Sequence, residues 1–499
     1  MVCIAQTTEK AATHVCCIGA GYVGGPTSAV MALKCSDIEF TVVDTDAKRI
    51  AAWNSSSLPV YEPGLDEIVR SVRGANLRFT TDIDAAIRAA DIVMIAVNTP
   101  LAPSGAAADA GDDGGGGCAP CGRPTDLSGV EQCVMRIAHA ARGPTIVVEK
   151  STVPCKTGDV VASILQRHGH AGAEFAVLAN PEFLSEGTAV RDLLDPDRVI
   201  IGGQRGTERA QAALAAVYAH WVAPDRIVTM GLWSAELAKL ASNAMLAQRI
   251  SSINAISAVC EATGADVADV ARGCAADSRI GDKYLRASVG FGGSCFQKDI
   301  ASLVWLCHSL GLPEVAEYWH QVLRVNEYQK SRFAQRIVHV AGGSLAGRRV
   351  ACLGFAYKAE TGDARNTPAA AVCRTLLAHG AQLAIYDPKV PAQSIIEHLG
   401  DPCLATEQHA KGNISSSSSS SRVRVCKSAY QAMDGACVVA ILAPWDEFRH
   451  IDWRRAASLL LDAPQPFVFD GQLVVDDVGE LEGLGLQVHV VGRRHVTSE

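Results

Sequence analysis

The stretch Val15–Asp44 constrains the fold more than any other part of the chain. An apolar strand, Val15–Ile18, leads into Gly19-Ala20-Gly21-Tyr22-Val23-Gly24, and a helical stretch begins near Pro26. A second strand, Phe40–Asp44, ends in an acid about 20 residues beyond the last glycine. A glycine fingerprint alone is weak evidence. In this order, however, strand, glycines, helix, strand and acid are typical of a dinucleotide-binding unit.

Each glycine of this fingerprint has its own steric role. Gly19 permits the tight turn, Gly21 lets the backbone approach a pyrophosphate, and Gly24 lets the helix pack on the strand. The pyrophosphate would lie at the helix N-terminus. Asp44 would accept hydrogen bonds from a ribose 2′-hydroxyl and repel a 2′-phosphate, which favours NAD over NADP. The alternative is a doubly wound domain that binds no nucleotide.

Further predicted strands end in polar segments: Ile92–Val97 before Asn98-Thr99-Pro100, Thr145–Glu149 before Lys150–Pro154, and Phe175–Leu178 before Asn180–Gly187. Ligands of open α/β sheets bind beyond the carboxyl ends of the strands. Thr99 and Thr152 are therefore placed to contact the cofactor. Glu182 and Glu186 are interpreted as facing a cleft, and the alternative is a solvated pair on a helix.

A long helix is predicted from Leu232 to about Thr263, because an apolar stripe at helical spacing continues without interruption. Glu236, Lys239 and Asn243 fall on one face of this helix at spacings of three and four residues. A lysine on a helix is commonly a solvated charge. Lys239 instead stands among small residues, in Ala-Lys-Leu-Ala-Ser-Asn, which suggests a face that contacts another surface.

A glycine-rich loop, Gly290-Phe291-Gly292-Gly293-Ser294-Cys295-Phe296-Gln297-Lys298-Asp299, leads into a helix predicted at Gln297–Leu310. Free N–H groups and the helix dipole at that terminus favour a thiolate at Cys295. Asp299 would stand one turn away on the same face. A thiolate beside a carboxylate is a candidate covalent site. The alternative is a buried, inert thiol, since the chain has 17 cysteines.

A second α/β pattern begins after the cysteine loop. Its strands are predicted at Arg349–Phe355, Leu383–Pro388, Cys437–Leu442 and Phe467–Asp470, with a helix near Ala369–His379. The full glycine fingerprint is absent. In its place Ala356–Arg365 carries Lys358 and Arg365, two cations suited to phosphates. The predicted fold class is therefore α/β, with two Rossmann-like doubly wound domains joined by a long central helix and a small all-α domain.

Composition excludes several classes of protein. The 499 residues are 48% hydrophobic, and the net charge of -8 provides no basic surface for nucleic acid. The first residues lack the apolar core of a signal peptide, and no run is long and apolar enough for a membrane span. Seventeen scattered cysteines predict reduced thiols in a cytoplasmic protein.

Two segments of biased composition are predicted to be loops. Residues 102–123 are rich in Ala, Gly and Asp and are predicted to be disordered. Cys118 and Cys121 lie in this insertion, but a structural zinc site needs four ligands and no second pair is near, so no metal is predicted. Ser415–Ser421 is a serine tract.

With these motifs in view, the chain resembles the UDP-glucose/GDP-mannose dehydrogenase family. The resemblance spans about 14–490, and Ala247–Asn254 looks like the animal-type members. The motifs that carry it are Gly19–Gly24, Tyr61–Leu65, Asn98–Pro100, Glu149–Pro154, Asn180–Gly187, Leu237–Ile256, Arg279–Gly281 and Gly290–Asp299. It implies oxidation of UDP-glucose to UDP-glucuronate with two NAD. It also implies an NAD-binding domain at 1–230, a central helical domain at 231–340, and a UDP-sugar-binding domain at 341–499.

The resemblance also implies the chemical roles of six residues. Cys295 is the nucleophile that forms a thiohemiacetal and then a thioester. Lys239 and Asn243 stabilise the developing oxyanion. Water is positioned or activated by Asp299, Thr152 and Glu182.

Binding residues follow from the same resemblance. Those expected to contact NAD are Gly19, Gly21, Tyr22, Val23, Gly24, Asp44, Arg49, Val97, Asn98, Thr99, Pro100, Ser151, Thr152, Glu186, Cys295, Lys298 and Arg365. Those expected to contact the substrate are Glu182, Phe183, Leu184, Glu186, Lys239, Asn243, Arg279, Arg286, Phe291, Gly292, Tyr357 and Lys358. Arg279 would reach the substrate of a neighbouring subunit, which implies an obligate dimer or hexamer. The family also suggests feedback by UDP-xylose.

One position departs from the family pattern. Members carry a substrate-binding arginine after the Phe-Asp-Gly of the last strand, whereas here Phe469–Gly471 is followed by Gln472 and Leu473. Losing one charge-assisted hydrogen bond costs about 1.5–3 kcal/mol. A raised KM for UDP-glucose is therefore expected unless Arg286, in place of a family lysine, compensates.

Three alternatives remain open at this stage. The first is the same chemistry on another sugar nucleotide, such as GDP-mannose or UDP-N-acetylmannosamine. The second is a two-electron hydroxyacid dehydrogenase, which needs Lys239 and Asn243 but not Cys295. The third is a catalytically silent sensor of UDP-sugar or NAD, to which the change at Gln472 gives some weight.

Overall fold

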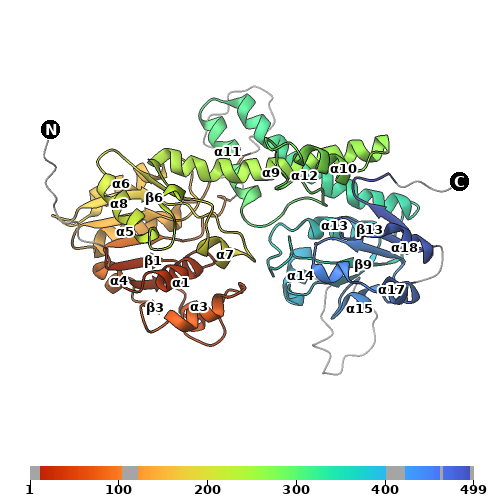
Figure 1. Cartoon of the computed structure of the whole chain (residues 1–499), viewed down its shortest axis with the longest axis horizontal. Helices are drawn as coiled ribbons and strands as arrows, with labels where there is room; N and C mark the ends of the chain where they lie inside the picture. The colour runs from red at the N-terminus through yellow and green to blue at the C-terminus, as the bar shows by residue number, and fades with distance from the viewer. Residues whose placement is uncertain (1–11, 104–121, 401–421, 461–464, 495–499) are drawn as a thin grey trace. The chain divides into compact units, whose positions relative to one another are not determined.

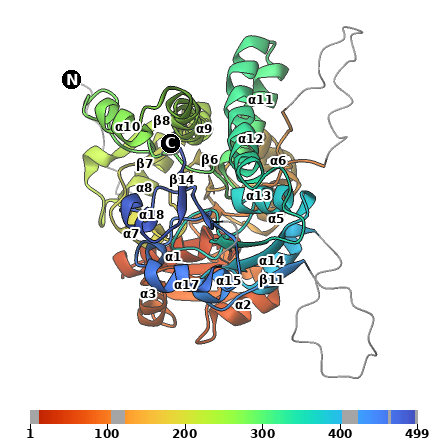
Figure 2. The same cartoon turned by 90° about the vertical axis from the view of Figure 1, so that its right-hand side faces the viewer.

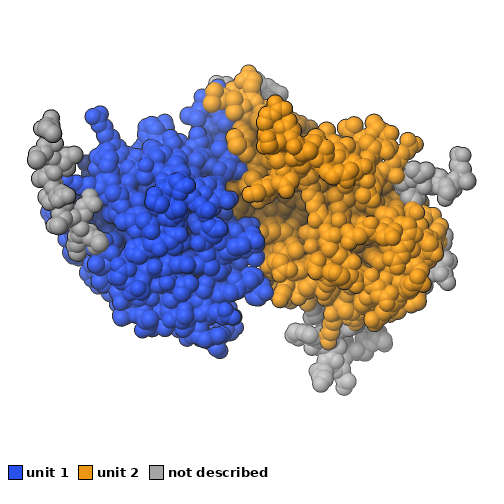
Figure 3. Space-filling model, in the orientation of Figure 1, with its two compact units in different colours: residues 1–242, 301–311 blue, residues 243–300, 312–499 orange. Residues whose placement is uncertain are grey.

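The computed structural model describes residues 12–103, 122–400, 422–460 and 465–494. It divides into two compact units, with residues 1–242 and 301–311 in unit 1, and residues 243–300 and 312–499 in unit 2 (Figure 3). The predicted boundaries near 230 and 340 stay predictions. Most of the insertion at 102–123, including Cys118 and Cys121, and the serine tract Ser415–Ser421 lie outside the described residues.

A sheet covered by helices forms the centre of unit 1 (Figure 1). It has eight strands in the order β3-β2-β1-β4-β5-β6-β7-β8. Neighbouring strands are parallel except β6 and β7, which pair antiparallel. The strands are β1 (His14–Ile18), β2 (Glu39–Val43), β3 (Leu77–Thr80), β4 (Ile92–Ile95), β5 (Thr145–Glu149), β6 (Phe175–Ala179), β7 (Val199–Gly203) and β8 (Ile227–Gly231). The strand order reverses between β1 and β4, which is where open α/β sheets bind ligands.

Helices cover both faces of this sheet, so its strands are apolar on both sides. Val15 and Cys17 of β1 enter one core, while Cys16 and Ile18 enter the other. The helices are α1 (Gly24–Lys34), α2 (Ala47–Trp53), α3 (Leu65–Val72), α4 (Ile83–Ala89), α5 (Ser128–Ala140), α6 (Thr157–His168), α7 (Ala189–Leu194), α8 (Glu208–Tyr218) and the short η1 (Pro224–Arg226).

Unit 2 is built on a second sheet, of which β11 and β14 are labelled in Figure 2. It has six parallel strands in the order β11-β10-β9-β12-β13-β14. Its strands are β9 (Arg349–Leu353), β10 (Gln382–Tyr386), β11 (Val423–Val425), β12 (Val438–Ile441), β13 (Phe467–Asp470) and β14 (Gln487–Val490). Its helices are α10 (Val267–Ala275), α12 (Pro313–Val340), α13 (Pro368–Ala378), α14 (Ala392–Leu399), α15 (Ala429–Met433), α16 (Asp446–Arg449), α17 (Trp453–Leu459) and α18 (Val478–Gly483). The order again reverses beside the first strand.

Two helices, α9 (Leu232–Thr263) and α11 (Phe296–Ser309), contribute residues to both units. The α9 bounds agree with the predicted ones. Helix α1 begins at Gly24, two residues before the predicted start. Pro26 therefore lies in the first turn, where a residue without a backbone N–H loses no helix hydrogen bond. The predicted α/β class with two doubly wound sheets is confirmed.

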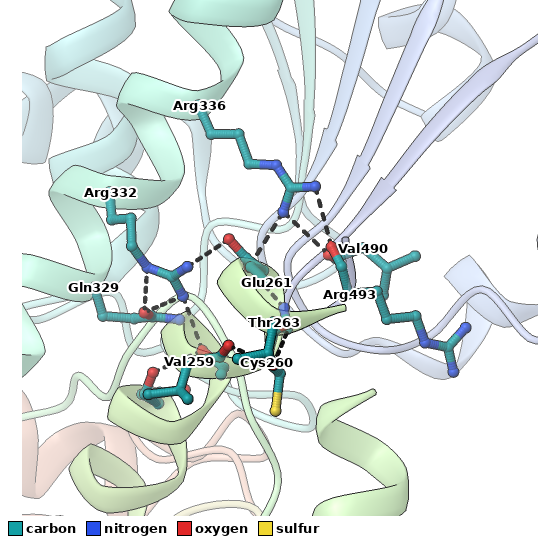
Figure 4. A network of polar contacts seen from close by, with 12 residues as sticks. Val259, Cys260, Glu261, Thr263, Gln329, Arg332, Arg336, Val490 and Arg493 are labelled. Carbon is teal, nitrogen blue, oxygen red and sulfur yellow. Dashed lines mark hydrogen bonds and ion pairs between the residues drawn. The ribbon is translucent and has the colours of Figure 1, made fainter. Parts of the chain in front are cut away.

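A charged cluster fastens the last described strand of unit 2 to its helices (Figure 4). Glu261 of α9 forms ion pairs with Arg332 and Arg336 of α12, the latter at 3.2 Å, and accepts a hydrogen bond from the Gly492 N–H at 2.7 Å. Arg336 also donates to the Val490 carbonyl at 3.2 Å. These bonds join residues far apart in sequence and fix the end of β14 on the helical layer.

Candidate active site

The glycine loop after β1 has the shape that a dinucleotide requires. Gly19 has φ +109°, and a Cβ there would collide with the Ala96 carbonyl. A Cβ at Gly24 would collide with the Gly19 carbonyl and lie 3.0 Å from the Cys17 sulfur, so helix and strand pack too closely for any side chain. A Cβ at Gly21 would meet nothing within 4 Å, so the backbone there is open to a ligand. The loop therefore fits the predicted pyrophosphate.

Asp44 stands at the end of β2, where a ribose is expected. Its carboxylate accepts a hydrogen bond from the Ala20 N–H at 2.9 Å and forms an ion pair with Arg49 at 3.0 Å. Asp44 and Arg49 are both among the residues expected to contact NAD. The structure therefore brings the glycine loop, Asp44 and Arg49 together.

The segments after β4 and β5 are tied to each other by hydroxyl groups. Thr99 Oγ1 donates to the Thr152 carbonyl at 2.8 Å, and Ser151 Oγ donates to the Val97 carbonyl at 2.7 Å. Val97–Pro100 and Ser151–Thr152, both predicted at the cofactor, are thus hydrogen-bonded to each other beyond the carboxyl ends of neighbouring strands.

A buried ion pair lies beside these segments and includes a residue that the sequence reasoning missed. Lys150 Nζ contacts the Glu182 carboxylate at 2.9 Å, Asn180 Oδ1 at 3.0 Å and the Tyr218 hydroxyl at 3.1 Å. The Lys150 side chain is 3% exposed. Its position directly after a predicted strand was a usable signal, but Tyr218 on α8 offered none.

Each member of this pair changes the ionisation of the other. Burial alone would raise the pKa of Glu182, but Lys150 and the Phe183 N–H hold it below its ordinary value. Burial alone would lower the pKa of Lys150, but Glu182 and Tyr218 raise it above its ordinary value. Both groups are therefore charged near neutral pH, and Glu182 is an acceptor rather than a proton donor.

The segment after β6 is a loop, so the solvated-helix alternative for Glu182 and Glu186 is wrong. The Phe183 and Leu184 N–H groups donate to Glu182 at 2.8 and 3.3 Å. Gly187 N–H donates to the Tyr22 hydroxyl at 3.3 Å and to the Glu62 carboxylate. Lys239 of α9 is buried and places Nζ 4.9 Å from the Phe183 ring centroid.

In unit 2, Cys295 precedes α11, and its carbonyl accepts the helix hydrogen bond of the Asp299 N–H at 2.8 Å. The Cys295 thiol is exposed, with Ser294 Oγ 3.5 Å from its sulfur. Asp299 is 1% exposed, accepts from Asn243 Nδ2 at 2.6 Å and forms an ion pair with Lys298 at 2.8 Å. An accessible thiol thus lies one turn from a buried, fully oriented carboxylate.

Amide side chains hold the cysteine loop from the helices behind it. Asn326 Oδ1 accepts from the Phe291 N–H at 2.8 Å, and its Nδ2 donates to the Phe291 carbonyl at 3.0 Å. Asn254 Oδ1 accepts from the Ser288 N–H at 2.9 Å, and Gln329 Nε2 donates to the Ser288 carbonyl at 2.6 Å. None of these amides was predicted, because nothing in the sequence marks which buried amides bracket a loop.

The loop after β9 packs on the cysteine loop. Gly293 N–H donates to the Arg365 carbonyl at 2.9 Å, and a Cβ at Gly292 would lie 2.7 Å from the Asn366 carbonyl. Lys358 Nζ lies 5.6 Å from the Tyr357 ring centroid. The predicted substrate residues Phe291, Gly292, Tyr357 and Lys358 therefore come from two loops that the structure joins.

The remaining predicted cations lie in different settings. Arg279 is 87% exposed and binds Asp277 at 2.6 Å, so its predicted reach to a neighbouring subunit stays a prediction. Arg286 donates to the carbonyls of Gln472 and Leu473, each at 2.7 Å. Gln472 is buried and donates to the Leu442 carbonyl at 2.6 Å. Gln472, at the position where the resemblance leads us to expect an arginine, is thus a buried amide, and the Arg286 guanidinium reaches the same segment.

A buried pair of carboxyl groups, Glu149 and Glu236, lies at the N-terminus of α6. Glu236 of α9 accepts hydrogen bonds from the Lys156 and Gly158 N–H groups at 2.6 and 2.7 Å, so it caps that helix from another element. Glu149, at the end of β5, is 2% exposed and lies against Glu236. Burial and the neighbouring acid raise the pKa of Glu149 well above its ordinary value, so Glu149 is the protonated partner.

Replacing Glu149 by glutamine should flatten the pH dependence of stability. A carboxyl whose folded pKa is raised stabilises the fold below its unfolded pKa, about 4.5, and this contribution is lost as pH rises through the folded pKa. Glutamine keeps a donor toward Glu236 and cannot ionise. Relative to wild type, E149Q should therefore gain stability as pH rises, measured by denaturant unfolding from pH 5 to 9. The exposed Glu174→Gln is the control, and parallel curves for E149Q and wild type would contradict the assignment.

Comparison with known proteins decides the family. Three family models match in order: UDP-glucose/GDP-mannose dehydrogenase family NAD binding domain at 13–222, central domain at 233–328, and UDP binding domain at 351–477. The chain belongs to the UDP-glucose/GDP-mannose dehydrogenase family. As a member it is an NAD-dependent dehydrogenase with a UDP-sugar-binding domain, and the predicted family, enzyme class and cofactor are confirmed.

Curated relatives of this dehydrogenase cover nearly its whole length. It is 50% identical to UDP-glucose 6-dehydrogenase 2 of Oryza sativa subsp. japonica over 482 residues, 96% of this chain and 97% of the relative. It is 48% identical to UDP-glucose 6-dehydrogenase of Drosophila melanogaster over 483 residues, 96% of each. A solved UDP-glucose dehydrogenase from Pyrobaculum islandicum matches with TM-score 0.79 and 30% identity, covering 99% of this chain and 100% of that one.

Proposed function

We propose that this dehydrogenase oxidises UDP-glucose to UDP-glucuronate in two successive two-electron steps. The observation that carries the proposal is the exposed Cys295 thiol at the start of α11, one turn from the buried Asp299 carboxylate. A two-electron alcohol dehydrogenase does not need such a nucleophile. The full-length similarity to curated UDP-glucose 6-dehydrogenases supports the choice of substrate.

NAD is the hydride acceptor in both steps. The glycine loop with Asp44 and Arg49 would hold its adenosine and pyrophosphate part, because Gly21 is open and the Asp44 carboxylate is held against the Ala20 N–H of the same loop. The segments 97–100 and 151–152 would flank it further along the same sheet edge. Glu186, Lys298, Cys295 and Arg365 complete the proposed set of cofactor residues.

Cys295 supplies the covalent step. After the first oxidation its thiolate adds to the C6 aldehyde to form a thiohemiacetal, so the reactive aldehyde is not released. Loss of a second hydride from C6 and of the hydroxyl proton leaves a thioester. Water then attacks the thioester carbonyl and releases the carboxylate and the Cys295 thiol. Two hydrides leave the substrate, one water enters, and the enzyme returns to its starting state.

The surrounding polar groups serve charge and proton transfer. Lys239 and Asn243 would stabilise the oxyanion at C6. Asp299 is held in one orientation by Asn243 and Lys298, so its carboxylate can take a proton from water during hydrolysis. Glu182, kept ionised by Lys150, and the Thr152 segment would position water.

Substrate choice is tested by initial rates. The enzyme should reduce NAD with UDP-glucose and show kcat/KM lower by about 100-fold or more with GDP-mannose and UDP-N-acetylmannosamine. A preference for either alternative would reject UDP-glucose as the substrate. Binding of UDP-glucose without any NADH formation would instead favour the sensor.

Arg286 should contribute the affinity for UDP-glucose that, in other family members, comes from the arginine expected at position 472. Its guanidinium reaches the Gln472 segment, so Arg286→Met should raise KM for UDP-glucose about tenfold or more and change KM for NAD little. Steady-state kinetics with each substrate varied in turn measures this. The exposed Arg272→Met on α10 is the matched control. An unchanged KM for UDP-glucose in R286M would remove Arg286 from the binding set.

Assembly, regulation and location complete the proposal. We propose a homo-oligomer, a dimer or a hexamer, in which Arg279 serves a neighbouring subunit, with UDP-xylose as feedback inhibitor. All the described cysteines are free, which supports the proposed cytoplasmic location. Among the described helices, none is long and apolar enough to cross a membrane. Light scattering measures the assembly, and rates unaffected by UDP-xylose would dispose of the feedback.

A further inference from the structure

We propose that Arg198 is an additional ligand-binding residue, which holds an anionic group of the bound sugar nucleotide beside the Phe183 ring. The proposal rests on the proposed function, because the anion comes from that substrate or its product. Arg198 precedes β7 and appears in none of the predicted sets of site residues.

The position of Arg198 places it beside the proposed substrate residues of unit 1. Its guanidinium carbon lies 3.7 Å from the Phe183 ring centroid, and Lys239 Nζ lies 4.9 Å from the same centroid. Two cations therefore contact one aromatic ring, which follows Glu182 directly in the chain. A guanidinium packs on an aromatic face through the ring quadrupole while its N–H donors remain free in its own plane.

Those donors have no protein acceptor in the described ranges, where Arg198 forms neither a hydrogen bond nor an ion pair. The side chain is nonetheless half-buried, and burial lowers its pKa, although Asp197 and Glu182 act in the opposite direction. A partly desolvated cation without an acceptor is unfavourable. The protein therefore retains a guanidinium that a ligand can neutralise.

The nearby carboxylate is already engaged. Glu182 binds Lys150 at 2.9 Å and accepts the Phe183 and Leu184 N–H groups. The charge of Glu182 raises the pKa of Arg198, but the two side chains form no ion pair. Arg198 thus acts as a separate cation, and its planar fork suits an oxyanion with two oxygens, a phosphate or a carboxylate.

The ligand offers this chemistry in two places. UDP-glucose carries a diphosphate before and after oxidation, and a carboxylate appears at C6 only in the product. Comparing UDP, UDP-glucose and UDP-glucuronate separates the two. Equal weakening of all three points to the diphosphate, and a loss confined to UDP-glucuronate points to the carboxylate.

Calorimetric titration without NAD tests the proposal on the full chain. Arg198→Met, which keeps apolar packing on Phe183, should weaken at least UDP-glucuronate by about 10- to 100-fold. Arg198→Lys keeps the charge without the fork and should recover part of the affinity, and it replaces the methionine variant if that protein does not fold. The exposed Arg205→Met, between β7 and α8, is the matched control.

Unchanged affinities for all three ligands in both Arg198 variants would overturn the proposal. So would a fall in kcat without any change in binding, because Arg198 would then act only through Phe183. If wild type binds UDP-glucose, and the variants bind UDP-glucose and UDP-glucuronate as tightly as wild type does, the role of Arg198 is rejected while the proposed function stands. If wild type does not bind UDP-glucose, the proposed function fails with it.

Discussion

Replacing Cys295 by serine should reduce the rate of UDP-glucuronate formation from UDP-glucose on the order of 10³-fold or more. The serine hydroxyl is a much weaker nucleophile at neutral pH than the thiolate, so the aldehyde is not trapped and the second oxidation does not follow. The helix hydrogen bond of Asp299 goes to the backbone carbonyl of residue 295 and persists in the variant. The fold and the affinity for UDP-glucose should therefore be retained, and circular dichroism and ligand titration check both.

Cys274→Ser is the matched control for this result, because that thiol is also exposed and lies on α10. Its activity should equal that of wild type. Full activity of C295S would contradict the covalent route and move the enzyme to the simple dehydrogenase class. Equal loss in C274S and C295S would show a general effect of thiol removal.

The second large effect is expected at the buried ion pair. Lys150→Met leaves the ionised, 16% exposed Glu182 without its buried cation, and breaking a largely buried pair in this way costs about 3 kcal/mol. The apparent melting temperature should fall by roughly 10 °C. The double variant K150M/E182Q removes both charges and should recover most of this loss. Double-variant stability as low as that of K150M would contradict the pairing.

The ion pair also predicts a pH window for its own contribution. The pKa of Glu182 is lowered in the fold, so its stabilisation is present above its unfolded pKa, about 4.5, and is lost as pH falls through the folded value. The pKa of Lys150 is raised, so its contribution is present below about 10.5 and is lost as pH rises further. The stability difference between wild type and K150M should therefore be greatest between these limits, as unfolding at a series of pH values would show.

Sequence reasoning succeeded where one local pattern determines the structure. Gly19, Gly21 and Gly24 are read from the order of strand, turn and helix, and their steric roles depend only on neighbouring backbone. Cys295 and Asp299 are four residues apart on the first turn of a helix, so spacing alone relates them.

It failed where a function depends on partners that are distant in sequence. Lys150 becomes a buried cation only because Glu182 and Tyr218 arrive from two other elements. Asn326 and Gln329 of α12 hold the cysteine loop and the residues before it. Glu236 of α9 caps α6, a helix that is distant from it in sequence. Buried amides and acids resemble exposed ones in sequence, since burial is a property of tertiary packing.

The ratio of NADH formed to UDP-glucose consumed tests the central claim most directly. UDP-glucose is limiting, NAD is in excess, and the product is identified by mass. The covalent four-electron route predicts two NADH for each UDP-glucose, with UDP-glucuronate as the product and no free aldehyde. One NADH for each UDP-glucose, with the aldehyde as product, would contradict it.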